Sequence, residues 1–133
     1  MEIPFDLLYI VASFYTKPRM KLYDWIPEEK LDWWYLSRNP NAITMIEIAL
    51  LQDPYKIDWS SLSFNPKALH LLEKYPDKID WCCLSENPNA IHLLKANLNK
   101  IYLEWLSKNP SIFEIDTVQM NLELTNKANN IDF

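Results

Sequence analysis

One block of apolar and polar positions recurs four times along the chain. A complete copy runs from an apolar residue and Asp-Trp, through two variable residues, to Leu-Ser, a variable residue and Asn-Pro, and then to Ala and another apolar residue. The copies occupy residues 31–43, 57–69, 79–91 and 101–112. Their Asn-Pro steps lie 26, 22 and 22 residues apart. A spacing of this size indicates a helical solenoid in which each repeat buries its apolar face on its neighbours.

The third copy indicates how the first half of a repeat folds. Asp80 stands where a helix N-cap is expected, because its carboxylate can accept hydrogen bonds from the N–H groups of the following turn. The pattern therefore predicts a first helix from residue 81 to residue 85 or 86. Asp32 and Asp58 are expected to cap the first helices of their own copies. In the fourth copy Tyr102 takes this position, so we expect that helix to fray.

The Asn-Pro step predicts the start of a second helix. Asn87 would be its cap and Pro88 its first residue, where the missing N–H of proline is harmless. The apolar stripe of this helix consists of Ala90, Ile91, Leu93 and Leu94. The two helices are expected to be about five or six and about nine residues long, and helices this short need stacking for stability.

Four additional residues separate the first two Asn-Pro steps, which is about one helical turn. We place them in a longer second helix over residues 40–52. The predicted fold is thus all-α, a short α-solenoid of helical-hairpin repeats of about 22 residues, in a single domain over residues 1–133.

The two ends of the chain are expected to cap this solenoid. Residues 1–30 would form N-terminal capping helices, over residues 4–15 and 20–25. The four repeats would fill residues 31–115. Residues 116–133 would add a C-terminal cap and a polar, loose tail from residue 126.

The composition of the chain argues against several classes of function. The chain of 133 residues has a formal net charge of −5, which disfavours nucleic acid as a partner, because phosphate binding needs clustered Lys and Arg. It has no Gly, which excludes glycine-rich phosphate loops and makes Asn and Asp the expected residues at positive φ. No apolar run is long enough to cross a membrane. The only cysteines, Cys82 and Cys83, are adjacent, which favours a reducing, intracellular setting.

The complete repeat phrase resembles a repeat family abundant in giant viruses of amoebae. The resemblance covers roughly residues 20–116 and rests on the approach Met20-Lys21-Leu22-Tyr23-Asp24-Trp25-Ile26-Pro27, on the third copy, and on the ending Asn109-Pro110-Ser111-Ile112-Phe113-Glu114. It implies a viral protein that acts inside the host cell or is carried in the virion. It implies no particular activity.

The opening segment resembles the start of an F-box, which begins with an apolar-Pro-x-acidic-apolar helix. The segment is Ile3-Pro4-Phe5-Asp6-Leu7-Leu8, and the remainder of an F-box is not recognisable. The resemblance implies a substrate adaptor of a host ubiquitin ligase as an alternative function.

The residues that recur have a structural explanation. Trp33, Trp59 and Trp81 could stack on bases, but the fourth copy has Leu103 in their place, so we expect a ladder in the core. The sequence lacks nucleophile and metalloprotease motifs, and we therefore predict no enzyme activity, no cofactor and no small-molecule substrate. A zinc site would need three or four converging ligands, and the adjacent cysteines point about 100° apart on a helix, so we predict no metal.

The positions that vary between copies are the candidates for binding a protein partner. Solenoids bind through such exposed positions, while packing holds the others. Aromatic residues and Arg are favoured at interfaces, and the two histidines occupy one variable position. The candidates are Trp34, Tyr35, Arg38, Phe64, His70, His92 and Trp105. The sequence therefore predicts a non-enzymatic protein-interaction module, with a ubiquitin-ligase adaptor and a structural virion component as alternatives. A solvated surface without any partner is the remaining alternative.

Overall fold

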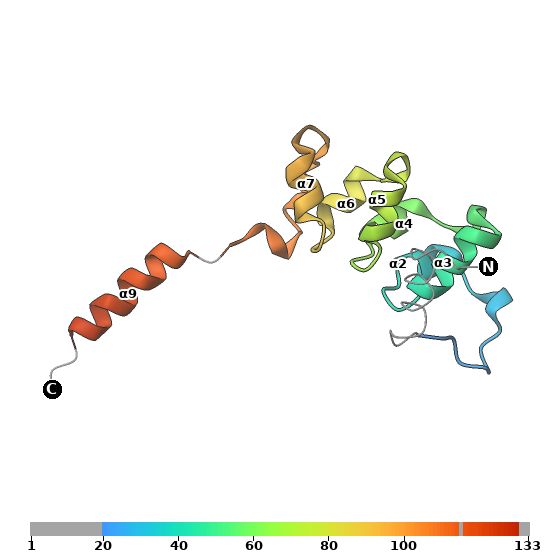
Figure 1. Ribbon diagram of the computed structural model, residues 1–133, viewed down its shortest axis with the longest axis horizontal. Coiled ribbons are helices and arrows are strands. Elements are labelled where there is room, and N and C mark those ends of the chain that lie inside the picture. Colours follow the sequence, from blue (N-terminus) through green and yellow to red (C-terminus); the bar gives the residue numbers. More distant parts are fainter. Residues whose placement is uncertain (1–19, 115, 131–133) are drawn as a thin grey trace, which may run out of the picture.

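The computed structural model describes residues 20–114 and 116–130, and over these ranges the chain is helical, without strands. Its helices pack one after another along the sequence (Figure 1). No helix in the described ranges combines the length and the apolar character needed to cross a membrane. The predicted helix over residues 4–15 lies outside the described residues.

The first helices of the four copies form a continuous row. They are α2 (Trp33–Arg38), α4 (Trp59–Phe64), α6 (Trp81–Glu86) and α8 (Leu103–Leu106). Each contacts the next, α2 with α4, α4 with α6 and α6 with α8. The predicted bounds of α6 are confirmed.

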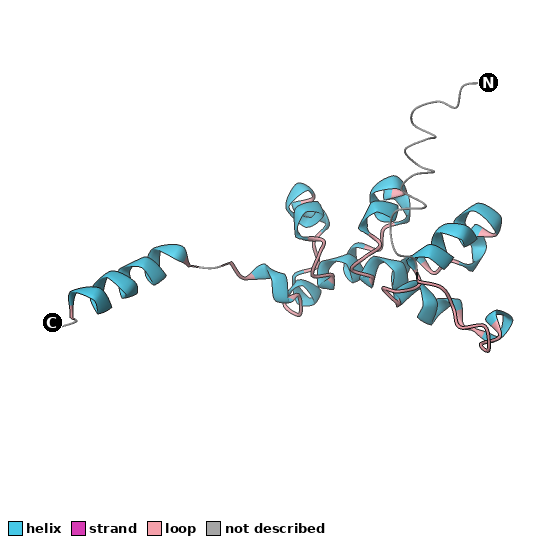
Figure 2. Cartoon of the chain, turned by 60° about the horizontal axis from the view of Figure 1, so that its bottom comes forward, coloured by secondary structure: helices cyan, strands magenta, loops and turns pink. Residues whose placement is uncertain are grey.

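The second helices project from one side of this row (Figure 2). They are α3 (Ile43–Gln52), α5 (Leu69–Lys74) and α7 (Ile91–Ala96). Because α3 has ten residues where α5 and α7 have six, the additional turn lies in the second helix, as predicted. A short 3-10 helix precedes each of the four first helices, at Glu28–Lys30, Pro54–Lys56, Pro76–Lys78 and Leu98–Lys100.

The predicted start of the second helix is wrong by three residues. Asn87 closes α6 instead, by donating its backbone N–H to Leu84 O at 3.0 Å, and Ala90 N–H returns to Asn87 O at 3.1 Å in a turn. Helix α7 begins only at Ile91, and the Asn side chain does not cap it. The corresponding helices α3 and α5 likewise begin after an Ala.

The predicted Asp caps are confirmed. Asp32 accepts from Trp34 N–H, Asp58 from Ser61 N–H, and Asp80 from the N–H groups of both residues that follow Trp81. Tyr102 makes no such bond, and α8 is correspondingly shorter, with four residues instead of six.

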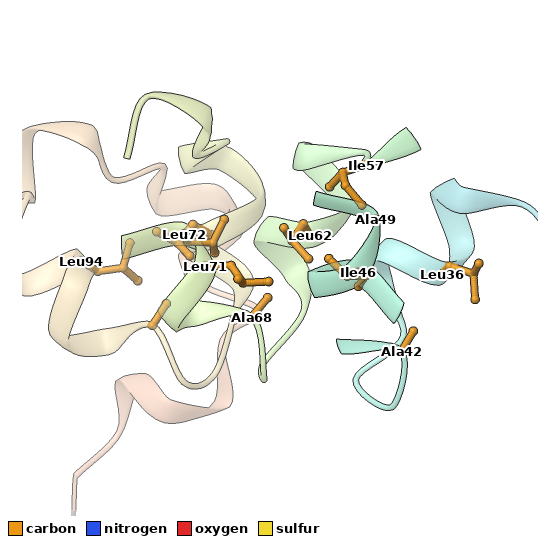
Figure 3. Packing of buried hydrophobic residues seen from close by; sticks show 12 residues of the cluster. Leu36, Ala42, Ile46, Ala49, Ile57, Leu62, Ala68, Leu71, Leu72 and Leu94 are labelled. Atoms are coloured by element: carbon orange, nitrogen blue, oxygen red, sulfur yellow. The ribbon is translucent and has the colours of Figure 1, made fainter. Parts of the chain in front are cut away.

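The core lies between the two rows of helices (Figure 3). Its members repeat with the copies: Leu36, Leu62 and Leu84 from the first helices, Ala42, Ala68 and Ala90 from the turns, and Ile46, Leu72 and Leu94 from the second helices. Trp33, Trp59 and Trp81 are half-buried and pack against this core from its edge. The tryptophans therefore shield the core, and smaller residues fill it.

The described residues at both ends differ from the predictions. Residues 20–25 form no helix, and the only regular feature there is a turn in which Ile26 N–H donates to Tyr23 O at 3.0 Å. At the other end the first part of the predicted loose tail, residues 126–129, belongs to helix α9, which spans Thr117–Asn129 and is capped by Asp116 accepting from Gln119 N–H at 2.9 Å. Residues 131–133 lie outside the described residues. None of the residues of α9 is buried, and the helix extends away from the packed helices (Figure 1).

Candidate functional site

A ladder of buried asparagines joins each repeat to the one before it. The side-chain amide nitrogen of Asn87 donates to Ser63 O at 2.9 Å and to Asn65 O at 3.1 Å. Its side-chain oxygen accepts from the backbone N–H of Asn89 at 3.1 Å. Asn65 and Asn109 make the equivalent bonds, and all three asparagines are at most 1% exposed.

A second ladder runs through the serines of the Leu-Ser pairs. Ser63 Oγ donates to Trp59 O in its own helix at 2.8 Å and accepts from Asp80 N–H of the next repeat at 3.0 Å. Ser37 and Ser85 do the same for the adjoining repeats. Sequence reasoning missed both ladders, although the survival of Ser107 and Asn109 in the fourth copy was a signal for them.

The ladders explain why these polar residues recur. In the described part of the chain, every buried side-chain nitrogen or oxygen atom has a hydrogen-bond partner. Buried polar groups without partners would be costly, so these serines and asparagines fix the register of one repeat on the next. They are consequently part of the framework of the fold.

Three predicted residues and a fourth one form a stack across the row of first helices. The Arg38 guanidinium lies 4.2 Å from the ring centroid of Phe64, and the Phe64 and Trp105 centroids are 6.2 Å apart, edge to face. The Lys108 ammonium lies 4.1 Å from the Trp105 ring. We call Arg38, Phe64, Trp105 and Lys108 the aromatic–cation row. Sequence reasoning did not select Lys108.

Two further candidates, Trp34 and Tyr35, are exposed on α2. Their rings meet edge to face with centroids 4.6 Å apart, and 46% and 67% of their surfaces are exposed. Exposed paired aromatics are suited to an interface, because they cover a large area with few rotatable bonds.

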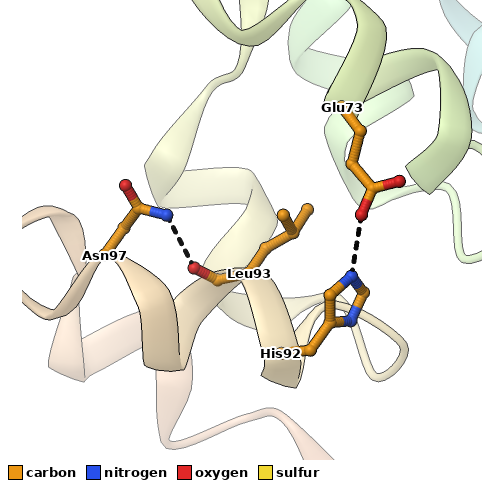
Figure 4. Close-up of polar contacts among 4 residues, drawn as sticks. All are labelled: Glu73, His92, Leu93 and Asn97. Carbon is orange, nitrogen blue, oxygen red and sulfur yellow. Dashed lines mark hydrogen bonds and ion pairs between the residues drawn. The ribbon is translucent and has the colours of Figure 1, made fainter.

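The two candidate histidines lie elsewhere, on the second helices. His70 Nε2 is 2.8 Å from Glu47 Oε1, and His92 Nε2 is 3.0 Å from Glu73 Oε1 (Figure 4). In both cases the Glu belongs to the preceding repeat. The histidines therefore tie second helices together, and the structure does not bring them to the aromatic–cation row.

The cysteines of α6 are half-buried thiols. Burial, assisted by the Asp80 carboxylate, raises the pKa of Cys83 to about 12, and burial likewise raises the pKa of Cys82. A thiol with a raised pKa is a poor nucleophile and a poor metal ligand, because both roles need the thiolate. Within the described ranges, no three His, Cys, Asp or Glu side chains are grouped as metal ligands.

Comparisons with protein-family models, with curated proteins and with solved structures found no match for this chain.

Proposed function

We propose that this chain is a non-enzymatic protein-binding module, built as a short α-solenoid of helical-hairpin repeats of about 22 residues. The successive packing of α2, α4, α6 and α8 and the recurring asparagine and serine bonds support the solenoid. Each repeat contributes the same framework residues and different surface residues, which is how solenoids carry extended binding surfaces.

The aromatic–cation row carries the functional proposal. It contains two cations, Arg38 and Lys108, in a chain whose net charge is −5. Both cations lie over aromatic faces, so they are held in place before any partner binds. Arg and aromatic side chains of this kind supply much of the binding energy in protein interfaces. A protein segment that carries acidic and apolar side chains is the partner that this row fits.

The test is capture of a partner by the full chain from extracts of infected amoebae. Arg38→Glu combined with Lys108→Glu reverses both cations of the row. The matched control, Lys95→Glu with Lys127→Glu, makes the same charge change at exposed positions on α7 and α9. A specific partner should be lost with the first pair and retained with the second. Equal capture by both double variants would contradict the proposal.

The viral setting rests on the resemblance of the repeat phrase to the giant-virus family. A protein of that family would act inside an amoebal host cell or be carried in the virion. Packaging in the virion would make the chain abundant in purified particles, and mass spectrometry of those particles would separate this role from action in the host cytoplasm.

A ubiquitin-ligase adaptor is the second candidate, because the opening Ile3-Pro4-Phe5-Asp6-Leu7-Leu8 resembles the start of an F-box. The full chain would then bind the ligase subunit that receives F-boxes. Changing Leu7 and Leu8 to Asp should abolish that binding and leave the melting temperature of the repeats unchanged. No binding by the unaltered chain would dismiss the adaptor and leave the binding module standing.

A further inference from the structure

The two ladders end at exposed edges that have complementary hydrogen-bonding groups. At the N-terminal edge, Asp32 N–H and the amide nitrogen of Asn39 donate to no group in the described part of the chain. The C-terminal edge has three acceptors of the same kind, Ser107 Oγ, Ser107 O and Asn109 O. No repeat follows them that could donate to these atoms. Asn39 and Ser107 are exposed, whereas their counterparts inside the ladders are buried.

These groups are the ones that pair at every internal junction. Where the third copy meets the second, Asp80 N–H donates to Ser63 Oγ at 3.0 Å. At the same junction Asn87 donates to Ser63 O at 2.9 Å and Asn65 O at 3.1 Å. The N-terminal edge therefore has the donors of such a junction, and the C-terminal edge has its acceptors. These residues hold the same positions in their repeats as the residues that pair inside the chain.

We propose that a second copy of this chain docks head to tail, its N-terminal edge continuing the ladder from the C-terminal edge of the first copy. Asn39 of one copy then donates to Ser107 O and Asn109 O of its neighbour, and Asp32 N–H donates to Ser107 Oγ. Because the two surfaces differ, the contact is heterologous, and it propagates into an open chain unless the rotation closes a ring.

Apolar surface supports the same contact. Leu103 occupies the tryptophan position of the fourth copy and is 73% exposed. At two of the three internal junctions a Lys that precedes the next repeat lies over the tryptophan, Lys56 over Trp33 at 5.5 Å and Lys100 over Trp81 at 4.7 Å. Lys30 precedes the first repeat, so its aliphatic stem covers Leu103 of the neighbouring copy.

One contact opposes docking. Ser60 Oγ donates to Asp80 Oδ2 across an internal junction at 2.8 Å. The residue at the Ser60 position of the last copy is Glu104, which would face the Asp32 carboxylate. Two like charges at this distance weaken association. Glu104→Ser replaces the repulsion with the hydrogen bond found inside the chain, so it should tighten association about tenfold.

Analytical ultracentrifugation of the full chain over a wide concentration range tests the proposal. The average mass should rise above the 15.9 kDa of one chain as concentration increases. Asn39→Asp removes both amide donors and keeps the acceptor for Asn41 N–H, so it should leave a folded monomer. Leu103→Lys places an ammonium group against Lys30 and should do the same. Asn99→Asp is the matched charge control and should associate as the unaltered chain does.

Mixing the edge variants shows the direction of assembly. Asn39→Asp blocks only the donor edge and Leu103→Lys only the acceptor edge, so an equimolar mixture retains one working pair. It should form a heterodimer and nothing larger. The proposal is overturned if the unaltered chain and Glu104→Ser both stay monomeric at every concentration. It is also overturned if both edge variants associate as strongly as the unaltered chain, since another surface would then be responsible.

Discussion

A comparison of the third and fourth copies of the repeat shows which residues the fold needs and which it can lose. The third copy has the Asp-Trp pair, a six-residue first helix and a six-residue second helix. The fourth has Tyr102 and Leu103 instead, a four-residue α8 and, in place of a second helix, the 3-10 helix Pro110–Ile112. Yet it docks on its neighbour through the same hydrogen bonds.

The bonds that survive are those of the two ladders. Asn109 donates to Ser85 O at 3.0 Å and Asn87 O at 2.8 Å, and Tyr102 N–H donates to Ser85 Oγ at 3.1 Å. The Asp cap and the Trp strengthen a repeat internally, whereas the Asn attaches it to the preceding repeat and the Ser to the following one. Attachment to the preceding repeat is thus what the second, third and fourth copies have in common.

The largest expected effect is the loss of an internal asparagine. Asn87→Ala leaves the buried Ser63 O without its donor, takes one of two donors from Asn65 O and removes the acceptor of Asn89 N–H, and an unsatisfied buried group costs about 1–3 kcal/mol. We expect the free energy of unfolding to fall by about 2–5 kcal/mol in a urea titration followed by circular dichroism. Asn39→Ala, at the exposed end of the same ladder, should cost less than about 1 kcal/mol. Equal losses would show that the ladder is not what holds the repeats together.

Substitutions at the tryptophan position should show a smaller difference in lost stability between the two copies. Trp81 packs half-buried against the core, so Trp81→Ala should cost about 2–3 kcal/mol, less than a fully buried ring. Leu103→Ala, at the same position of the fourth copy, and His92→Ala, in an exposed hydrogen bond, should each stay within about 0.5 kcal/mol. Thermal melts of the three variants measure this. A melting temperature for Trp81→Ala like that of His92→Ala would contradict the role of Trp81 in shielding the core.

Restoring the missing helix cap should make the first helix of the fourth copy more stable and so more like that of the third copy. Tyr102→Asp supplies the carboxylate that the other first helices have, and it keeps the backbone N–H that donates to Ser85. We expect α8 to be stabilised by about 0.5–2 kcal/mol. Hydrogen exchange of the Leu106 and Ser107 amides should slow, while amides in α4 serve as the internal reference. Unchanged exchange in α8 would mean that its short length has a cause other than the lost cap.

The smallest effect concerns Cys83, whose position in the fourth copy is taken by Trp105. Burial and the Asp80 carboxylate raise the pKa of the Cys83 thiol from its ordinary value of 9.0 to about 12. A raised pKa means that folding favours the thiol, so its contribution to stability is complete below pH 9 and is lost as the pH rises toward 12. Alkylation at pH 9 should therefore be slower in the native chain than in urea. Equal rates would show that the folded environment does not protect this thiol.

The elements predicted well are those set by neighbouring residues. The bounds of α6 and the Asp caps depend on contacts within one turn, and the local pattern contains them. The start of α7 was predicted wrongly because Asn-Pro is also a favourable helix start in isolation. In each of the first three copies a turn from the Asn to the Ala precedes the helix, even at Asn39, whose side-chain amide donates to no group in the described chain. The sequence also could not show that Asn87 binds carbonyl groups 22 and 24 residues earlier, because no local propensity reports a partner at that separation.

The candidate site was predictable only as a set of positions. Variation between copies identified Arg38, Phe64 and Trp105 as surface residues. These residues stack on one another, and Lys108 completes the row. The stacking depends on how far each first helix is rotated relative to the next, which the sequence does not show. For the same reason the sequence could not show that His70 and His92 face glutamates of the preceding repeat.

The turns between helices have a consequence for how this protein can change over generations. No described residue has a positive φ, although the sequence suggested that asparagines would supply that conformation. The backbone conformation of every turn in the described ranges is therefore one that ordinary L-amino acids can adopt. The residue after each Asn-Pro step already varies, as Asn41, Lys67, Asn89 and Ser111. Mutation can thus alter the charge and shape of these loops from copy to copy without straining the backbone.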